Sequence, residues 1–441
     1  MCREVWHPRS VATSHPRTAR GTEFVDGQVG SPSFGVVGDG IRAAFAADAA
    51  HRASRPGAAT PPALVCYLAH HLGRTTIGEP RLLRERRRAF LVGWEIEELT
   101  EKLTEELRCA DVLLGISEFN TGVFRHHFPA VPAITVPVCP PFPSRPAADR
   151  HRWGIPDGVI AFLNVFNPVS GFDRKNPIDV HDAFVRAFPG RQDVRLVFKV
   201  HGGFAKQPDE LDLTGEEHRA AAFLARCADD DRVILVDEFL DYDDVLTLVA
   251  SCDAYVSLAR AEGLGLPVLE AMALGVPTVC MDYSGHSDFV SEEGSLLVPY
   301  DMAAVPDDAS HYYNPRYYAG QPQWARPRIA DAAAMMCRLA DDPALRERLG
   351  RGAVDAAAAY RKRCEESPWL ADLEAALDSP AVASQHAARE REFQRVARRD
   401  RDEWLDHERN VRRARRHLAI RTRLGRVKRH LLGVLPRRLR G

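Results

Sequence analysis

The sequence predicts an α/β protein in which parallel sheets are covered by helices, and two observations lead to this fold class. Short apolar runs alternate with stretches of helical spacing along most of the chain, which is the pattern of parallel sheets with crossover helices. A proline-dense stretch at residues 139–146, with the sequence CPPFPSRP, divides this alternation in two and is typical of a linker. We therefore expect two doubly wound units joined near residue 146.

Composition limits the class of protein. The chain has 441 residues, of which 45% are hydrophobic and 27% charged, so two globular domains are expected. No run approaches the roughly 18 apolar residues of a membrane-spanning helix, and the Arg-, His- and Pro-rich start lacks the apolar core of a secretory signal. The nine cysteines are scattered without a C-x-x-C pair. We expect reduced thiols, a cytoplasmic location, and neither a disulfide framework nor a zinc site.

Charge is distributed unevenly along the chain. The net charge is −2, but 13 of the 59 Lys and Arg residues follow residue 408, whereas none of the 61 Asp and Glu residues does. Residues 380–441 are predicted to form a charged helical tail, which is basic and amphipathic from residue 409. Such a helix can bind an anionic membrane surface; a partner-binding or solvated tail is the alternative. The acidic body and the absence of an aromatic platform in the tail argue against nucleic-acid binding.

The first half of the chain is less regular than the second. Residues 1–33 are polar without periodicity and are expected to be poorly ordered, and a short N-terminal unit follows at 34–145. Its apolar run at 34–40 ends in glycines before a helical stretch, a pattern that can face a phosphate or sugar but is more often a plain turn. His70 follows a predicted strand, where it could touch a substrate or, more commonly, be a capping or exposed residue. Strands are predicted at 62–68, 90–96, 111–117 and 133–138, and helices at 41–52, 97–110 and 120–127.

Residues 155–365 predict a second doubly wound unit with regular alternation. In such a sheet, ligands bind beyond the carboxyl ends of the strands. Strands are predicted at 159–166, 194–200, 232–236, 253–258, 276–281 and 295–298, and helices at 177–188, 216–227, 241–250, 267–274, 326–340 and 343–363.

Two loops at strand ends carry the residue types of a ligand site. Arg174 and Lys175 stand before a helix start, where a guanidinium fork, an ammonium and the helix dipole can all bind phosphate. The alternative, at about even odds, is a solvated helix start. The loop RAEGLGL at residues 260–266 places Glu262 and Glu270 on either side of a second helix start.

The glycines of this second loop let the main chain approach a ligand. Its free amides lie at a helix N-terminus and can bind phosphate or sugar oxygens, while the two carboxylates could each accept the hydroxyls of one ring. A solvent-exposed Glu262 and a dipole-complementing Glu270 would be the alternative, but several suitable loops at one sheet edge favour the site.

Together, these motifs resemble glycosyltransferase family 4, whose members are retaining enzymes with the GT-B fold. The resemblance rests on E-x7-E from Glu262 to Glu270, on Arg174-Lys175-Asn176-Pro177, on ISEF at residues 116–119 and on QWARP at residues 323–327. It is dense from residue 155 to residue 340. Arg326 stands where the family usually has an acidic residue.

The resemblance implies a division of roles. Arg174 and Lys175 would bind the diphosphate of a nucleotide-sugar donor, and Glu270 would hold the ribose. Glu262 would contact the transferred sugar and stabilise positive charge at its anomeric carbon. Sugar hydroxyls or phosphate would be held by the amides of Gly263, Leu264, Gly265 and Leu266. The acceptor would lie on the N-terminal unit, where the candidate contacts are His70 and Ser117, and no metal or other cofactor is expected.

We therefore expect a retaining hexosyltransferase that moves a sugar from a nucleotide-diphosphate donor to a glycan or lipid-linked acceptor. The expected setting is bacterial surface-polysaccharide or cell-wall assembly, in the cytoplasm or on the inner face of the cell membrane. The alternative is a non-catalytic nucleotide-sugar- or glycan-binding subunit of a glycosyltransferase complex.

Overall fold

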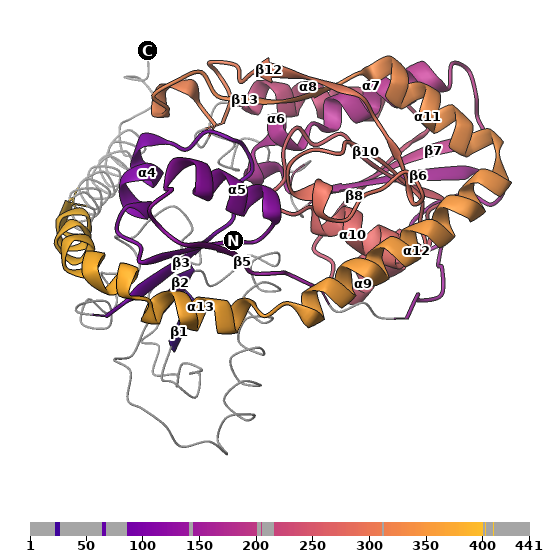
Figure 1. Cartoon of the computed structure of the whole chain (residues 1–441). Helices are drawn as coiled ribbons and strands as arrows, with labels where there is room; N and C mark the ends of the chain where they lie inside the picture. Colours follow the sequence, from indigo (N-terminus) through magenta and orange to yellow (C-terminus); the bar gives the residue numbers. More distant parts are fainter. Residues whose placement is uncertain are drawn as a thin grey trace, which may run out of the picture.

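The structure is a computed structural model of the chain. It describes residues 23–26, 64–67, 86–140, 144–200, 204, 216–310, 313–399, 402 and 409. Within these ranges the molecule consists of two α/β units that lie side by side (Figure 1).

The N-terminal unit contains a five-stranded parallel sheet whose strands follow one another in chain order. Its strands are β1 (Glu23–Asp26), β2 (Leu64–Tyr67), β3 (Arg88–Val92), β4 (Val112–Gly115) and β5 (Ala133–Thr135). Two helices connect the last three strands: α4 (Glu101–Leu107), capped by the side chain of Thr100, and α5 (Glu118–His127), capped by Ser117. Because right-handed crossovers that always step in one direction place their helices on one face, the other face of this sheet needs a separate cover.

That cover comes from the C-terminal part of the chain. Alternate residues of a strand point to opposite faces: Phe90 is buried with Leu103 of α4 and Phe124 of α5, whereas Leu91 is buried with Leu373. Leu373 belongs to α13 (Trp369–Asp378), to which α12 (Pro343–Glu366) leads back from the second unit. In Figure 1 these two helices run along one side of both units.

The second unit contains a six-stranded parallel sheet in the order β11-β10-β9-β6-β7-β8. Its strands are β6 (Ile160–Phe166), β7 (Val194–Val200), β8 (Val233–Asp237), β9 (Ala254–Ser257), β10 (Thr278–Cys280) and β11 (Ser295–Leu297). The chain adds β7 and β8 on one side of β6, then returns to place β9, β10 and β11 on the other. The strand order therefore reverses between β6 and β9, which is where open α/β sheets bind ligands.

Helices cover both faces of this second sheet. They are α6 (Phe172–Lys175), α7 (Pro177–Ala187), α8 (Glu217–Asp229), α9 (Tyr242–Ala250), α10 (Leu266–Ala273) and α11 (Ile329–Asp341). Short 3-10 turns occur at η1 (Pro168–Ser170), η3 (Ser284–Asp288) and η4 (Pro315–Tyr317). A cluster of buried aromatic rings, including Phe166, Phe172, Phe198 and Phe223, packs edge to face beneath the start of α6. It fixes the segment that carries Arg174 and Lys175.

The structure corrects three of the sequence-based predictions. Residues 23–26, expected to be poorly ordered, form β1, which is too short to show a period in the sequence. The helix predicted from residue 326 begins at Ile329, because Arg326 precedes Pro327 and a residue before proline favours extended backbone. Arg326 instead belongs to β13 (Gln323–Pro327), which pairs antiparallel with β12 (Tyr300–Ala304). Helix α13 was not predicted at all.

Other predictions fall partly or wholly outside the described residues. These are the strand and helix expected at 34–52, His70, and nearly all of the basic tail from residue 409. Residues 380–399, which lie within the predicted tail, are helical and pack on the N-terminal unit through Arg389 and Phe393. The short helix α6 and the strand β12 were not predicted. The strand predicted at 90–96 ends at Val92, and the helix predicted from residue 97 begins at Glu101. The other helices and strands were predicted close to their observed positions.

Candidate functional site

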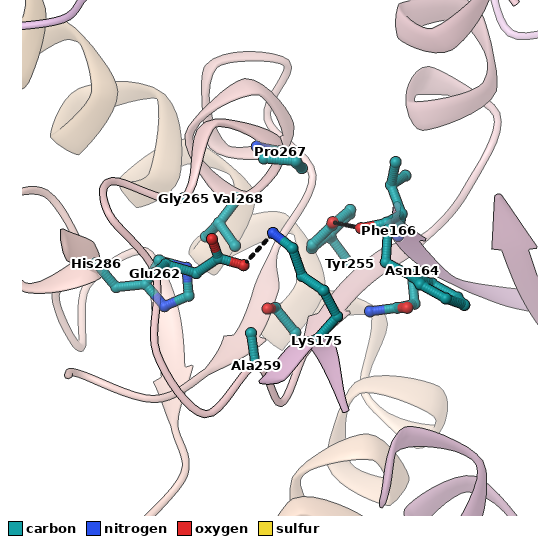
Figure 2. A pocket seen from close by; sticks show the side chains of 12 residues that line it. Asn164, Phe166, Lys175, Tyr255, Ala259, Glu262, Gly265, Pro267, Val268 and His286 are labelled. Atoms are coloured by element: carbon teal, nitrogen blue, oxygen red, sulfur yellow. Dashed lines mark hydrogen bonds and ion pairs between the residues drawn. The ribbon is translucent and has the colours of Figure 1, made fainter. Parts of the chain in front are cut away.

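The candidate site lies where the strand order of the second sheet reverses. A small pocket there is lined by the ends of β6 and β9, by Lys175, by the loop from Glu262 to Val268, and by His286. Figure 2 shows the ammonium group of Lys175 pointing at the carboxylate of Glu262 across this pocket. The sequence-predicted loops therefore meet at one sheet edge.

Glu262, Arg174 and Lys175 form a buried ion cluster. The Nζ atom of Lys175 lies 2.6 Å from Oε1 of Glu262, and Nη1 of Arg174 lies 3.1 Å from Oε2. Burial raises the pKa of Glu262, but the two cations outweigh it and lower the pKa to about 2. Burial lowers the pKa of the Lys175 ammonium, and Glu262 opposes that shift. Glu262 is therefore ionised and satisfies both cations at neutral pH.

Arg174 is also held by main-chain carbonyl groups. Its guanidinium donates to the carbonyl oxygens of Ser170 and Ala261, at 2.8 and 2.7 Å. Asn176 follows in the left-handed conformation that asparagine tolerates, and its side-chain amide donates to the carbonyl of Leu258 at the end of β9. The motif Arg174-Lys175-Asn176-Pro177 thus ties the loop after β6 to the loop after β9.

The glycines of the second loop lie in close contact with other residues of the protein. A Cβ atom on Gly265, whose φ is +95°, would lie 2.2 Å from the ring of His286, and one on Gly263 would lie 3.2 Å from Ile116. The two glycines therefore allow close packing against other segments of the protein itself. Gly265 immediately precedes α10. In the first turn of α10, Pro267 has no N–H and the amides of Val268 and Leu269 donate to the carbonyl of Gly265, so an anion at this helix start would depend on the amides of Gly263 to Leu266.

Glu270 lies apart from Glu262 and does not line the pocket. Its side chain is 9% exposed, and Tyr242 at the start of α9 donates its hydroxyl to Oε1 at 3.0 Å. Burial raises the pKa of Glu270 to about 7, and the Tyr242 hydrogen bond opposes the shift. The two carboxylates predicted to grip different rings are thus separated by the first turn of α10 and have opposite protonation behaviour.

Of the two predicted acceptor-side residues, Ser117 and His70, the structure describes only Ser117. The hydroxyl of Ser117 is fully buried and accepts a hydrogen bond from the amide of Asn120, so it caps α5. His70 lies outside the described residues.

Three residues that the sequence analysis missed surround the ion cluster. Tyr313 stacks its ring under the Arg174 guanidinium, 5.6 Å from centroid to Cζ, and donates its hydroxyl to Glu95 at 2.9 Å. His286 is 2% exposed, and its Nε2 has no hydrogen-bond partner among the described residues. A signal for Glu95 was present, because a charged residue follows the end of a buried strand in the sequence GWEIE.

Two searches of the described part of the chain gave negative results. No group of three or more His, Cys, Asp or Glu side chains there is arranged to hold a metal ion. None of its helices combines the length and apolarity that crossing a bilayer requires.

Comparisons with known proteins match parts of the chain to glycosyltransferases. Residues 174–313 match the family model described as Glycosyl transferases group 1. The lipopolysaccharide core biosynthesis mannosyltransferase LpsB of Rhizobium meliloti (strain 1021) is 33% identical over 108 residues, which cover 24% of this chain and 27% of that protein. The O-antigen chain mannosyltransferase B of Escherichia coli is 36% identical over 63 residues, 14% of this chain and 16% of that one. The chain thus matches about a quarter or less of the length of these relatives.

Solved structures establish the fold. Sucrose-phosphate synthase (tll1590) from Thermosynechococcus elongatus superposes with a TM-score of 0.51 at 16% identity, covering 79% of this chain and 80% of that one. The α,α-trehalose 6-phosphate synthase from Burkholderia multivorans gives 0.50 at 14% identity, covering 81% and 78%. The fold is therefore GT-B, two Rossmann-like units that face each other. The matched segment begins at Arg174 and ends at Tyr313, so it contains the whole ion cluster.

Proposed function

We propose that the protein is a retaining glycosyltransferase that transfers a hexose from a nucleotide-diphosphate sugar to a glycan or lipid-linked acceptor. The observation that carries this proposal is the buried cluster of Arg174, Lys175 and Glu262 at the reversal of the strand order. The matched group 1 segment and the two mannosyltransferase relatives support it. Because both relatives are named for mannose transfer in surface polysaccharides, mannose is the first hexose to test.

The roles follow from charge. In the protein without ligand, Glu262 is the partner of both cations, so a donor diphosphate has to replace it at Lys175. Arg174 and Lys175 would then stabilise the charge on the departing diphosphate, helped by the amides of Gly263 to Leu266. The released Glu262 carboxylate would face the sugar, where it stabilises the positive charge that develops at the anomeric carbon.

Glu270 would bind the vicinal hydroxyls of the ribose, since a carboxylate can accept both at once. Tyr242 holds this side chain in place through the hydrogen bond to Oε1. To accept hydrogen bonds from the ribose hydroxyls, Glu270 would use its other oxygen, Oε2, and would have to be ionised. Loss of a proton from Glu270 would therefore accompany donor binding at neutral pH.

A screen of ligands and turnover tests the proposal. Selective binding of a nucleoside diphosphate raises the apparent melting temperature, so ADP, GDP, UDP and CDP are compared at equal concentration, followed by the mannose and glucose donors of the best base. We expect one base to stabilise the protein and its sugar donor to be turned over. Binding without turnover on any acceptor extract would favour the non-catalytic subunit, and stabilisation by none of the four would refute donor binding.

A further inference from the structure

Glu95 reaches the ion cluster from the N-terminal unit. It lies three residues beyond the end of β3, outside the segment that matches the group 1 family. Its Oε2 accepts a hydrogen bond of 2.9 Å from the hydroxyl of Tyr313, and its Oε1 lies 3.9 Å from Nη2 of Arg174. The ring of the preceding Trp94 packs 6.5 Å from the ring of Tyr313. Glu95 is therefore a fixed part of the site, although it belongs to the other sheet.

Among the described residues, only one of the two carboxylate oxygens of Glu95 has a hydrogen-bond donor. Tyr313 satisfies Oε2, and among the described residues no donor lies within hydrogen-bond distance of Oε1. The Glu95 side chain is 20% exposed, more than the 13% of Glu262 and the 4% of Arg174. A carboxylate that is held on one side and open on the other is prepared to accept a hydrogen bond from an incoming group.

The neighbouring charges select what that group can be. Arg174 lies between two carboxylates, Glu262 from its own unit and Glu95 from the other. At Oε1 of Glu95, an anion would be repelled by the carboxylate itself. A cation there would be repelled by the guanidinium of Arg174. A neutral donor such as a sugar hydroxyl meets neither penalty.

We propose that Oε1 of Glu95 binds the acceptor hydroxyl that attacks the anomeric carbon of the donor sugar. The inference rests on the proposed glycosyltransferase function. In the step, the bond between the anomeric carbon and the diphosphate oxygen breaks, and its electron pair leaves with the diphosphate. A bond forms from the acceptor oxygen to the same carbon, and the hydroxyl proton passes to the departing diphosphate. Glu95 orients the hydroxyl, and its own protonation state is unchanged.

The substitution Glu95→Gln separates this role from a structural one. The amide oxygen of glutamine can still accept the bond from Tyr313, while an NH₂ group, which is a donor, takes the place of Oε1. Tyr313→Phe does the reverse, because it removes the bond and leaves the carboxylate. Glu97→Gln is the matched control, since Glu97 is an exposed carboxylate in the same loop. Each variant is tested as the full chain, with its melting temperature as a check of folding.

Two quantities are measured for each variant: the Kd of the best nucleoside diphosphate by calorimetry, and turnover of its mannose donor with methyl mannoside or with water alone. For Glu95→Gln we expect transfer to methyl mannoside to fall about 10- to 100-fold, as for loss of a hydrogen bond to a charged group. The Kd should stay within about threefold of the wild type, a change worth less than one such bond. Hydrolysis should fall together with transfer, because the attacking water takes the place of the acceptor hydroxyl.

Two outcomes would overturn the inference alone. In one, Glu95→Gln transfers as well as Glu97→Gln. In the other, Glu95→Gln and Tyr313→Phe weaken diphosphate binding to the same extent, which would make Glu95 a support for Arg174. A wild-type protein that binds no nucleoside diphosphate and turns over no donor would instead refute the proposed function, and the inference with it.

Discussion

The two units of the molecule differ in how they reach the site. The second sheet reverses its strand order between β6 and β9, so it opens a crevice of its own and lines it with residues from adjacent strand ends. The described strands of the N-terminal sheet run in chain order without a reversal, and this unit contributes Glu95 and Ile116 from the ends of β3 and β4. Most residues of the candidate site thus belong to the second unit, and the N-terminal unit adds Glu95 and Ile116 where it contacts the second.

The units also differ in how their sheets are covered. The second sheet is covered mainly by its own crossover helices. The N-terminal sheet depends on α13 for one face, because its crossovers place α4 and α5 on the other. Stability of the N-terminal half therefore depends on residues nearly three hundred positions away from β3 in the chain, and this can be measured.

The largest effect on stability is expected from Leu373→Ala in α13. Leu373 is fully buried against the N-terminal sheet, and such truncations cost about 2–5 kcal/mol. Hydrogen exchange should show lost protection in β3 and β4, with β7 and β9 unchanged. Val354→Ala on α12, where the side chain is 42% exposed, is the control. Equal loss of protection in both sheets would show that the two units unfold as one.

Gly265→Ala should be the next most damaging change, and it acts on the second unit. The new methyl group would overlap the His286 ring at a backbone φ of +95°, a conformation that costs about 1–3 kcal/mol for a residue with a side chain. Gly122→Ala in α5 is the matched control, since a Cβ there meets nothing within 4 Å; it should stabilise the helix by about 1 kcal/mol. Chemical denaturation measures both. A neutral Gly265→Ala would contradict the close packing at His286.

A smaller effect concerns Glu270 and pH. If its carboxylate binds ribose hydroxyls, nucleoside diphosphate affinity should rise between pH 6 and pH 8, by about tenfold, because the free side chain titrates near 7. The ligand phosphate also titrates in this range, so Glu270→Gln serves as the reference. Calorimetry in two buffers should detect more proton release on binding at pH 7 for the wild type than for Glu270→Gln.

The raised pKa of Glu270 also makes the stability of the folded protein fall as pH rises. Because the folded pKa of Glu270 lies above its ordinary value of 4.5, its contribution to stability is complete below pH 4.5 and is lost as pH rises through 7. The wild type should therefore lose stability relative to Glu270→Gln over this interval. A constant difference between the two across pH 4.5–7 would contradict the burial of an ionisable Glu270.

The smallest effect is expected from deletion of residues 409–441. We propose that this basic segment binds anionic membrane surfaces, so its removal should reduce sedimentation with vesicles containing phosphatidylglycerol while donor turnover in solution stays the same. Vesicles of phosphatidylcholine are the control. Unchanged sedimentation with anionic vesicles would refute the membrane role and leave a partner-binding or solvated tail.

The helices and strands of the second unit could be predicted from the sequence more closely than those of the N-terminal unit. Local signals sufficed for the second unit: the helices predicted at 241–250 and 267–274 agree within one residue with α9 and α10, and the strand at 194–200 was predicted with its observed bounds. These elements are specified by residues within one or two turns of themselves. The resemblance to family 4 favoured a diphosphate-binding role for Arg174 and Lys175 over a solvated helix start, but their ion pairs with Glu262 were not predicted.

What the sequence did not show depends on contacts between distant segments. Helix α13 has apolar residues at helical spacing, Trp369, Leu373 and Leu377, so a signal existed, but nothing local says that it covers another unit. Glu95 is unremarkable until Tyr313, 218 positions away, donates to it. Ser117 shows the converse, because a polar residue at a strand end proved to be a helix cap.

Competition between Glu262 and a donor diphosphate for Lys175 and Arg174 is tested directly by calorimetry of the best nucleoside diphosphate. Lys175→Ala should weaken binding about 10- to 100-fold, through loss of a charge-assisted contact. Glu262→Gln should tighten binding, because the neutral amide holds the cations less strongly, while turnover falls about 100- to 1000-fold. Lys362→Ala, at an exposed lysine of α12, should change neither. Equal weakening of diphosphate binding by Lys175→Ala and Glu262→Gln would show that Glu262 does not compete with the diphosphate.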